Sequence, residues 1–449
     1  MAGGVAADVE TGPNWVGRAL DGGGEWKVRS VAPYLLGLLM LFDSWDSIVI
    51  AYALPVIIAE WKLSALAAGA LVSAGYGGQF LGAIFFGTVA ERYGRLPVLR
   101  WLVAIMSVLA GACAIVDTYD HLMIIRFVQG LAIGGALPVA ISYVNEVAPT
   151  ATRGRFFGSF QFLMVAGFGA ASVASAFIVP VYGWRPVFAV GAVPLAILPF
   201  TFILPESPRW LAAKGRIADA VSALARLGCG KGQVRMPAEA EVQPPSERVP
   251  FALLVAPGRR GTFFTAIALW FLTYLVSFGL TTWTPSLYIS VFKIPLADAL
   301  RYGIISAAII FIIPLILRAT IDRFGRRPPA IIGMAIGGLA LFVIPLLDPA
   351  MIPAVVTFSI LGAVGISFGA MVLWPYSAEI FETRIRSLAL GVMSSTARGA
   401  SMLTPVVVGG ILQATGSVTP VFLIFGAASI IAVLLWLFGT RETAGREIG

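Results

Sequence analysis

The stretch GTVAERYGR at Gly87–Arg95 ends an apolar segment, and its charged part recurs as DRFGR at Asp322–Arg326. A second pattern is also repeated: a Tyr and a Glu at the end of an apolar segment, then an Arg and a Gly, lie in 143–158 and again in 376–391. The two patterns recur at nearly the same separation along the chain. Repeats at one separation indicate a duplicated structural unit, so the sequence predicts two related halves.

The composition is that of a membrane protein. Of the 449 residues, 58% are apolar and only 12% are charged, and the mean hydropathy is +0.90. A soluble domain carries about 25% charged residues, so an ordinary soluble enzyme is excluded. The excess of 31 Lys and Arg over 23 Asp and Glu is not gathered into a patch with aromatic residues. We therefore expect the lipid bilayer, and no nucleic acid, as a partner.

Twelve stretches are apolar over the length of about 20 residues that a membrane-spanning helix needs. The sequence thus predicts an all-α integral membrane protein with twelve transmembrane helices in two pseudo-symmetric six-helix bundles. The stretches are 31–58, 66–90, 97–116, 121–146, 156–180, 184–204, 261–290, 299–317, 329–347, 353–380, 386–413 and 418–439.

The basic residues between these stretches indicate their orientation. Nearly all of them fall on the side that also holds the two termini, and the other side holds only Lys62, Arg185, Lys293 and Arg301. Cytoplasmic loops are the ones enriched in Lys and Arg, so both termini are predicted to be cytoplasmic. We expect a multi-pass protein of a plasma membrane, the inner membrane of a bacterium.

These features predict five regions. They are a cytoplasmic tail (1–30), the first six-helix bundle (31–204), a cytoplasmic linker (205–260), the second six-helix bundle (261–439) and a second cytoplasmic tail (440–449). In the linker, Ile217, Val221, Leu224 and Leu227 recur at helical spacing, which predicts an amphipathic helix on the cytoplasmic face. Two facing halves would enclose a central cavity whose access alternates as they rock.

Four ionisable residues lie deep in the predicted spans: Asp43, Asp46, Arg126 and Arg398. Each costs about 2.5–3.5 kcal/mol on insertion scales, which makes each a candidate for function. Asp43 and Asp46 share a helix face, and a carboxylate in a low-dielectric cavity can exchange a proton near neutrality. For Asp43, a role in packing or gating is the alternative. The depths of Asp46 and Arg126 are compatible, so we predict an ion pair that breaks when Asp46 is protonated. A static structural salt bridge is the alternative.

Arg398 is the candidate for substrate binding. It lies mid-span, shortly after Ser394 and Ser395. A guanidinium group is always charged and binds a carboxylate through a bidentate fork, so this position suits capture of an organic anion. The alternative is a bridge to an acidic partner in the other half. Polar and aromatic residues that could complete the site, or serve packing alone, are Gln161, Thr282, Trp283, Trp374 and Tyr376.

Charged residues at the predicted cytoplasmic helix ends form a third group. Such charges can bridge the halves when the cavity is closed on the inside and must separate when it opens, so we predict gating and not substrate contact. They also fit a simpler role as topology anchors. The group comprises Glu91, Arg95, Glu146, Arg153, Asp322, Arg326, Glu379 and Arg386.

Over essentially its whole length the sequence resembles the major facilitator superfamily. Gly87–Arg95 is similar to the superfamily's loop signature after helix 2, and PESPRWL at Pro205–Leu211 is similar to an element after helix 6 of sugar porters and organic-ion transporters. The resemblance implies the two-bundle fold and a transporter. In related sugar porters a helix-1 Asp and a helix-4 Arg couple transport to protons, which implies this role for Asp46 and Arg126.

Three further motifs resemble one branch of the superfamily, the aromatic acid:proton symporters. They are DSWD at Asp43–Asp46, GLTTWTP at Gly279–Pro285 and ARG at 397–399. This resemblance implies proton-coupled transport of a small organic anion, an aromatic or other monocarboxylate. A sugar or neutral-metabolite:proton porter, and a drug or metabolite exporter of the same fold, are the alternatives.

An integral-membrane enzyme is not expected. The chain has one His and two Cys, which lie in different contexts, and no cluster of acids at one membrane level. It therefore lacks a nucleophile–base or metal constellation. We expect no cofactor and no metal, and a carrier that functions as a monomer with a small organic acid and protons as its ligands.

Overall fold

The computed structural model describes residues 15–21, 28–229 and 250–443, without the side chains of Ala151, Arg318, Asp322, Thr383, Arg384 and Ser387. Within these ranges every regular element is a helix, which confirms the all-α prediction. Parts of the predicted tails (1–30 and 440–449) and of the linker (205–260) fall outside the described residues. Eleven of the described helical segments are long and apolar enough to cross a membrane.

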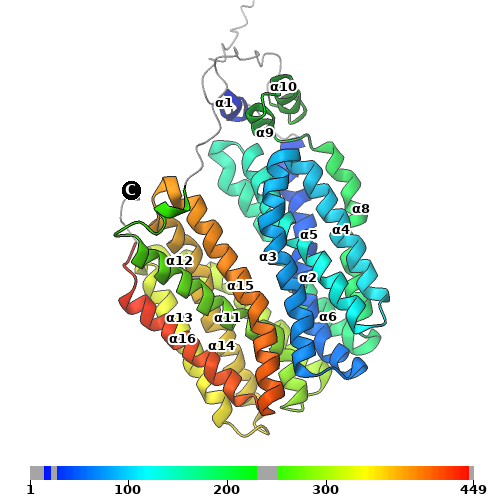
Figure 1. Cartoon of the computed structure of the whole chain (residues 1–449), viewed down its shortest axis with the longest axis vertical. Coiled ribbons are helices and arrows are strands. Elements are labelled where there is room, and N and C mark those ends of the chain that lie inside the picture. Colours follow the sequence, from blue (N-terminus) through cyan, green and yellow to red (C-terminus); the bar gives the residue numbers. More distant parts are fainter. Residues whose placement is uncertain (1–14, 22–27, 230–249, 444–449) are drawn as a thin grey trace, which may run out of the picture.

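The first bundle is drawn on the right in Figure 1. Its sixth span, Arg185–Ile203, is a run of short α and 3₁₀ segments, since Pro194 and Pro199 have no backbone N–H to donate. The elements of the bundle are α2 (Val28–Trp61), α3 (Ala65–Tyr93), α4 (Arg95–Ile115), α5 (Tyr119–Val147), η1 (Thr150–Thr152), α6 (Arg153–Tyr182), α7 (Arg185–Ala189), η2 (Val190–Ala192), α8 (Pro194–Ile197) and η3 (Leu198–Ile203).

The second bundle is drawn on the left in Figure 1. One of its long helices, α15, is not among the eleven apolar segments; Arg398 and several Ser and Thr residues make it the more polar helix. The elements are η5 (Phe251–Leu253), α11 (Arg260–Ser290), α12 (Leu296–Phe324), α13 (Arg327–Val343), η6 (Ile344–Leu346), α14 (Ile352–Ile380), α15 (Thr383–Thr415) and α16 (Thr419–Phe438).

The two bundles meet closely where α3 begins and α15 ends. A Cβ atom added at Gly69 of α3 would lie 2.2 Å from the carbonyl oxygen of Pro405, and one added at Gly409 of α15 would lie 2.3 Å from that of Ala65. Only glycine permits helix backbones to approach this closely. We call this end of the molecule the far end, and it is the end at which the bundles are closed against each other.

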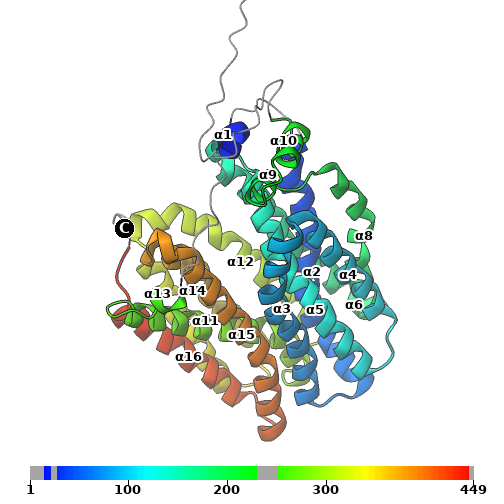
Figure 2. The ribbon, with the colours of Figure 1, turned by 45° about the horizontal axis from the view of Figure 1, so that its top comes forward.

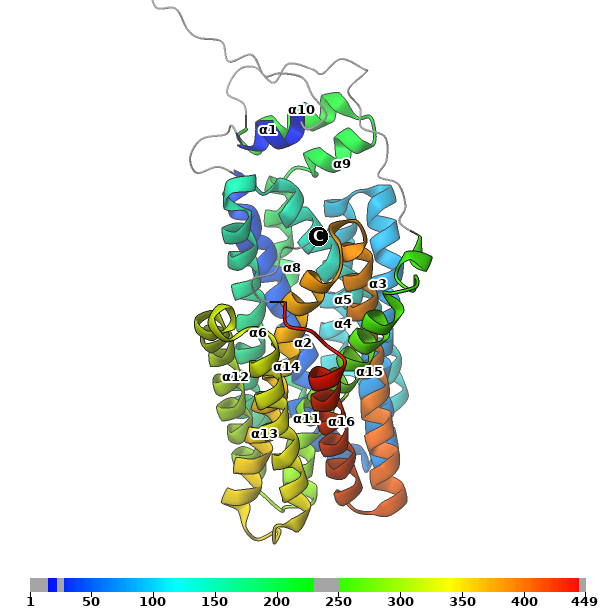
Figure 3. The ribbon, with the colours of Figure 1, turned by 90° about the vertical axis from the view of Figure 1, so that its left-hand side faces the viewer.

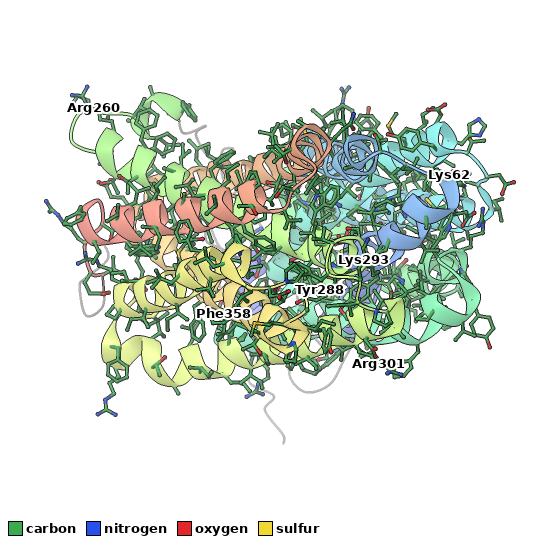
Figure 4. The ribbon with its side chains drawn as sticks, turned by 90° about the horizontal axis from the view of Figure 1, so that it is seen from below. Lys62, Arg260, Tyr288, Lys293, Arg301 and Phe358 are labelled. Carbon is green, nitrogen blue, oxygen red and sulfur yellow. The ribbon has the colours of Figure 1, made fainter. Side chains whose placement is uncertain are left out.

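The far end also carries the few basic residues that the sequence assigns to the outer side. Figure 4 looks onto this end and labels Lys62, Lys293 and Arg301. The fourth, Arg185, pairs there with Glu60 of α2 at 2.8 Å. These basic residues thus gather at one end, as a single membrane orientation requires.

Three short helices lie at the opposite end, which we call the capped end: α1 (Trp15–Asp21), α9 (Pro208–Ala213) and α10 (Ile217–Arg226). Figures 1, 2 and 3 show them above the first bundle, and Figures 1 and 2 show the two bundles diverging toward them. The helix α10 lies in the segment for which the sequence predicts an amphipathic helix. It buries Leu224 in one core with Trp210 of α9 and Leu20 of α1, a helix that the sequence pattern does not predict.

The glycine contact at the far end gives a first prediction. The substitution Gly69→Ala places a methyl group against the Pro405 backbone, so we expect closure of the far end to be hindered and substrate uptake to fall at least tenfold, about 1.4 kcal/mol in activation free energy. Initial uptake rates in cells, normalised to protein in the membrane, measure this. The matched control is Gly87→Ala on the same helix, where nothing lies within 4 Å of the added atom. Equal rates for the two variants would contradict the prediction.

Candidate functional site

Three polar side chains form a buried cluster inside the first bundle. Arg126 of α5 donates from Nη1 to Asp46 Oδ2 of α2 at 2.5 Å and to Gln129 Oε1 at 2.8 Å. Gln129 donates from Nε2 to Asp46 Oδ1 at 2.9 Å and to the Met106 carbonyl oxygen at 3.2 Å. The three side chains are 4% exposed or less. The predicted contact between Asp46 and Arg126 is present, while its role in coupling stays a prediction.

Gln129 is not among the candidate site residues predicted from the sequence, although its position relative to Arg126 could have identified it. It follows Arg126 by one helical turn and therefore shares its face. A side-chain amide has both a donor and an acceptor. Here Nε2 donates to the Asp46 carboxylate, and Oε1 accepts from the Arg126 guanidinium. Gln129 thus holds both charged partners in place. Asp43, one turn before Asp46, is also buried but does not belong to this cluster.

Arg398 lies midway along α15, and its guanidinium has few partners. Nη1 donates to Ser394 Oγ, one turn earlier on the same helix, at 2.8 Å. No other hydrogen bond and no ion pair of this guanidinium is found among the described residues. A guanidinium group carries five N–H donors, so most of them remain available to a ligand.

Tyr274 of α11 is the aromatic residue near Arg398, and it belongs to a group of three rings. Tyr274 lies within electrostatic range of Arg398, and its hydroxyl accepts from Trp374 Nε1 at 2.9 Å. Trp270 stacks on Tyr274 with 5.3 Å between ring centroids and meets Trp374 edge-on at 4.9 Å. Trp374 is 47% exposed, so this aromatic group has an accessible surface. A cation near an aromatic group is suited to a ligand with both a carboxylate and a ring.

The other predicted ligand residues lie in different places. Thr282 and Trp283 are buried on α11, and neither Thr282 Oγ1 nor Trp283 Nε1 has a described hydrogen-bond partner. Gln161 is half-buried on α6, nearer the capped end. Tyr376 is 3% exposed and packs against Trp436, with 4.7 Å between ring centroids. Because its ring lies inside the second bundle, we leave Tyr376 out of the proposed site.

The charged residues of the repeated motifs pair within each bundle. Arg95 Nε donates to Glu146 Oε1 at 3.1 Å in the first bundle. Arg326 Nη2 donates to Glu379 Oε1 at 2.7 Å in the second. None of the ion pairs among the described residues joins the two bundles at the capped end. The predicted bridges between halves are therefore not formed in this conformation, in keeping with the divergence of the bundles there.

The remaining members of this group are placed as follows. The backbone oxygen of Glu91 accepts from Trp210 Nε1 at 2.9 Å. Arg386 Nε donates to the Phe381 carbonyl oxygen at 3.3 Å, and Arg153 Nε is buried without a described hydrogen bond. The side chain of Asp322 is not among those described. Within the described ranges, no group of three or more His, Cys, Asp or Glu side chains could hold a metal ion.

Two glutamates cap the helices that follow the repeated motif. Glu206 Oε2 accepts from the backbone N–H of Leu96 at the start of α4, at 3.2 Å. In the second bundle, Glu442 accepts from the backbone N–H groups of Arg326 and Arg327 at the start of α13, at 2.8 and 3.0 Å. Helix N-termini leave such N–H groups unsatisfied, and carboxylates satisfy them. The same cap therefore closes the same helix start in both halves.

Glu206 gives a second prediction. Burial raises the pKa of Glu206 above the ordinary glutamate value, so its stabilising contribution is complete below that value and falls as pH rises through the raised pKa. We expect Glu206→Gln, which keeps an acceptor without a charge, to leave the melting temperature at pH 7 nearly unchanged. Glu206→Ala removes the cap and should lower the unfolding free energy by about 1 kcal/mol. Thermal unfolding in detergent measures both, and a greater loss in the Gln variant would refute this account.

Residues 34–448 match the family model described as sugar (and other) transporter. This chain belongs to that family. Its members are transporters and not enzymes. The match extends over both bundles and the linker, and begins within α2. The resemblance to the major facilitator superfamily is confirmed.

Named relatives of the transporter cover most of its length. It is 29% identical over 430 residues to the niacin transporter NiaP of Acinetobacter baylyi, covering 92% of this chain and 94% of the relative. It is 26% identical to the benzoate transport protein of the same species, covering 88% of this chain and 86% of the relative. A gallate transporter of Pseudomonas putida is 34% identical over 277 residues, 58% of this chain and 60% of that protein.

Solved structures show the fold of the transporter. A crystal structure of a D-xylose-proton symporter superimposes with a TM-score of 0.72 at 22% identity, covering 93% of this chain and 99% of that one. A partially occluded inward-open conformation of the xylose transporter XylE from E. coli gives 0.72 at 21% identity, with 94% and 99% covered. The transporter therefore has the major facilitator fold.

Proposed function

We propose that this transporter moves a small aromatic carboxylate across the membrane together with protons, by alternating access. The observation that carries the proposal is Arg398, a mid-helix cation with one described hydrogen bond, near Tyr274 and the aromatic group to which Tyr274 belongs. A bound carboxylate would pair with the guanidinium while its ring packs on the aromatic group. Relatives named for niacin, benzoate and gallate support this substrate class.

Proton coupling is assigned to Asp46 and Arg126. Both side chains of this ion pair are buried, and burial of two charges is costly, which favours a functional role for the pair. Protonation of Asp46 removes the attraction. Gln129 Oε1 then still accepts from Arg126, which limits the cost of leaving the guanidinium without its counter-ion. Asp43 is the second carboxylate on this helix.

The topology belongs to the same proposal. We take α15 as the twelfth span, because it is 33 residues long and packs between α3 and α11. The capped end and both termini are assigned to the cytoplasm, with tails 1–30 and 440–449, bundles 31–204 and 261–439, and a linker 205–260. The closed far end then makes this conformation inward-facing. The protein is assigned to a bacterial inner membrane and acts as a monomer.

The motif charges at the capped end act as the gate in this scheme. When the far end opens, the cytoplasmic ends of the bundles approach each other. The pairs Arg95–Glu146 and Arg326–Glu379 are half-buried and close to that surface, so their charges become available to the other bundle. Glu91, Arg153, Asp322 and Arg386 are assigned to the same gate.

Uptake of radiolabelled benzoate into proteoliposomes tests the proposed function. With an acidic exterior, we expect accumulation of benzoate above its external concentration, competition by niacin, and no competition by xylose. An uncoupler that collapses the pH gradient should abolish the accumulation. Competition by xylose with no transport of benzoate would favour the sugar porter, and proton-dependent extrusion of benzoate would favour an exporter.

A further inference from the structure

Asp43 is a buried carboxylate without a described side-chain partner. It is 7% exposed, and Oδ1 makes no hydrogen bond. Asp46, one turn later, has both of its oxygens engaged, by Arg126 and Gln129. The two acids of the DSWD motif are therefore in different environments: one is fixed inside the first bundle and the other is left without a bonded partner.

The cation near Asp43 belongs to the other bundle. Asp43 of α2 and Arg398 of α15 lie within electrostatic range of each other, yet no nitrogen–oxygen distance of 4.0 Å or less joins them. Both lie near the middle of their helices, and both helices border α11, which brings Tyr274 to Arg398. The charge of Arg398 is therefore balanced by the Asp43 carboxylate without a direct contact between the two groups.

We infer that Arg398 is a shared counter-ion, balanced by the Asp43 carboxylate when the site is empty and by the substrate carboxylate when Asp43 is protonated. This inference rests on the proposed function and specifies how substrate binding is tied to a proton. The bond formed is the O–H bond on Asp43, and the bond broken is an O–H bond of a hydronium ion in solution, which leaves a water molecule.

Charge balance explains why anion binding requires a proton on Asp43. With Asp43 ionised, the pair with Arg398 is neutral, and an incoming anion would add an unbalanced negative charge to a site of low dielectric, which is costly. With Asp43 protonated, Arg398 and the substrate anion form the neutral pair. Anion and proton therefore bind together, and either one alone binds poorly.

The other ionisable groups around this pair do not provide the same balance. Asp46, on the same helix, already has Arg126 as its partner. Tyr274 of α11 is the other group that acts on Arg398, and it accepts a hydrogen bond from Trp374. Tyr76 of α3 acts on the Asp46 cluster, and α6, which packs along α2, has no ionisable residue between Arg155 and Tyr182.

Binding of benzoate to the purified full-length protein, measured by calorimetry from about pH 6 to 9, tests the inference; carboxylic acids such as benzoate stay ionised in this range. In the wild type we expect the affinity for benzoate to fall as pH rises, by up to about tenfold per pH unit, because one proton is bound with each anion. In Asp43→Asn the affinity should change less than twofold over the same range. Glu60→Gln, an acid-to-amide change on the same helix at the far end, is the matched control and should keep the wild-type slope.

Three results would overturn the inference: no pH dependence in the wild type, a wild-type slope in Asp43→Asn, or loss of benzoate binding in a folded Asp43→Asn protein. A second measurement needs no variant: a pH indicator in weakly buffered solution should report up to one proton taken up per benzoate bound. Failure of benzoate, niacin and gallate to bind at any pH would instead reject the proposed function, and the inference with it.

Discussion

Replacement of Arg398 by alanine is expected to abolish measurable accumulation of benzoate and to weaken its binding about 10- to 100-fold. The reason is that charge-assisted hydrogen bonds contribute about 1.5–3 kcal/mol, and every 1.4 kcal/mol is tenfold in affinity. The guanidinium has only Ser394 as a described hydrogen-bond partner, so a ligand provides the larger part of its interactions. Binding calorimetry and proteoliposome uptake measure the two effects.

Two variants serve as controls for this result. Ser394→Ala removes the one described partner of Arg398 but keeps the cation, so it should lower affinity less than fivefold. Arg398→Lys keeps the charge without the bidentate fork and should give an intermediate loss. Unchanged transport of benzoate by a folded Arg398→Ala protein would eliminate Arg398 as the anion site.

Replacement of Asp46 by asparagine is expected to reduce accumulation driven by a gradient of one pH unit by up to tenfold, because each coupled proton contributes about 1.4 kcal/mol per pH unit. Asparagine retains an oxygen that accepts from Gln129, but it has no charge to be neutralised by a proton. The conformational change therefore no longer depends on protonation at this position. Exchange of labelled for unlabelled benzoate without a pH gradient should continue, since it needs no net proton movement.

The same variant has a stability readout. Removing one partner of a buried ion pair costs about 3–5 kcal/mol, and asparagine should lessen this by keeping its polar contacts. Asp46→Asn should therefore melt below the wild type and above Asp46→Ala. Arg185→Gln, which breaks a half-exposed pair with Glu60 at the far end, should change the melting temperature little. Persistence of full proton-driven accumulation in Asp46→Asn would show that Asp46 is not a coupling residue.

The sequence determined what depends on local composition. Long apolar stretches, the repeated charged motifs and the cost of each charge in a span follow from the chain itself. They predicted a helical membrane protein of two related halves and singled out Asp43, Asp46, Arg126 and Arg398. The ion pair of Asp46 with Arg126 could also be predicted from the sequence, because two opposite charges at the same depth in different helices have few other partners.

Tertiary structure decided which partners those groups have. The rotation of each helix about its axis turned Tyr376 into the second bundle, brought Gln129 onto the Asp46 carboxylate and placed Asp43 within range of Arg398. Helix periodicity gives the face on which a residue lies, but not which neighbouring helix that face meets. That choice is made by the packing of whole helices, with glycines such as Gly69 setting how closely the backbones approach, and it depends on residues far apart in the chain.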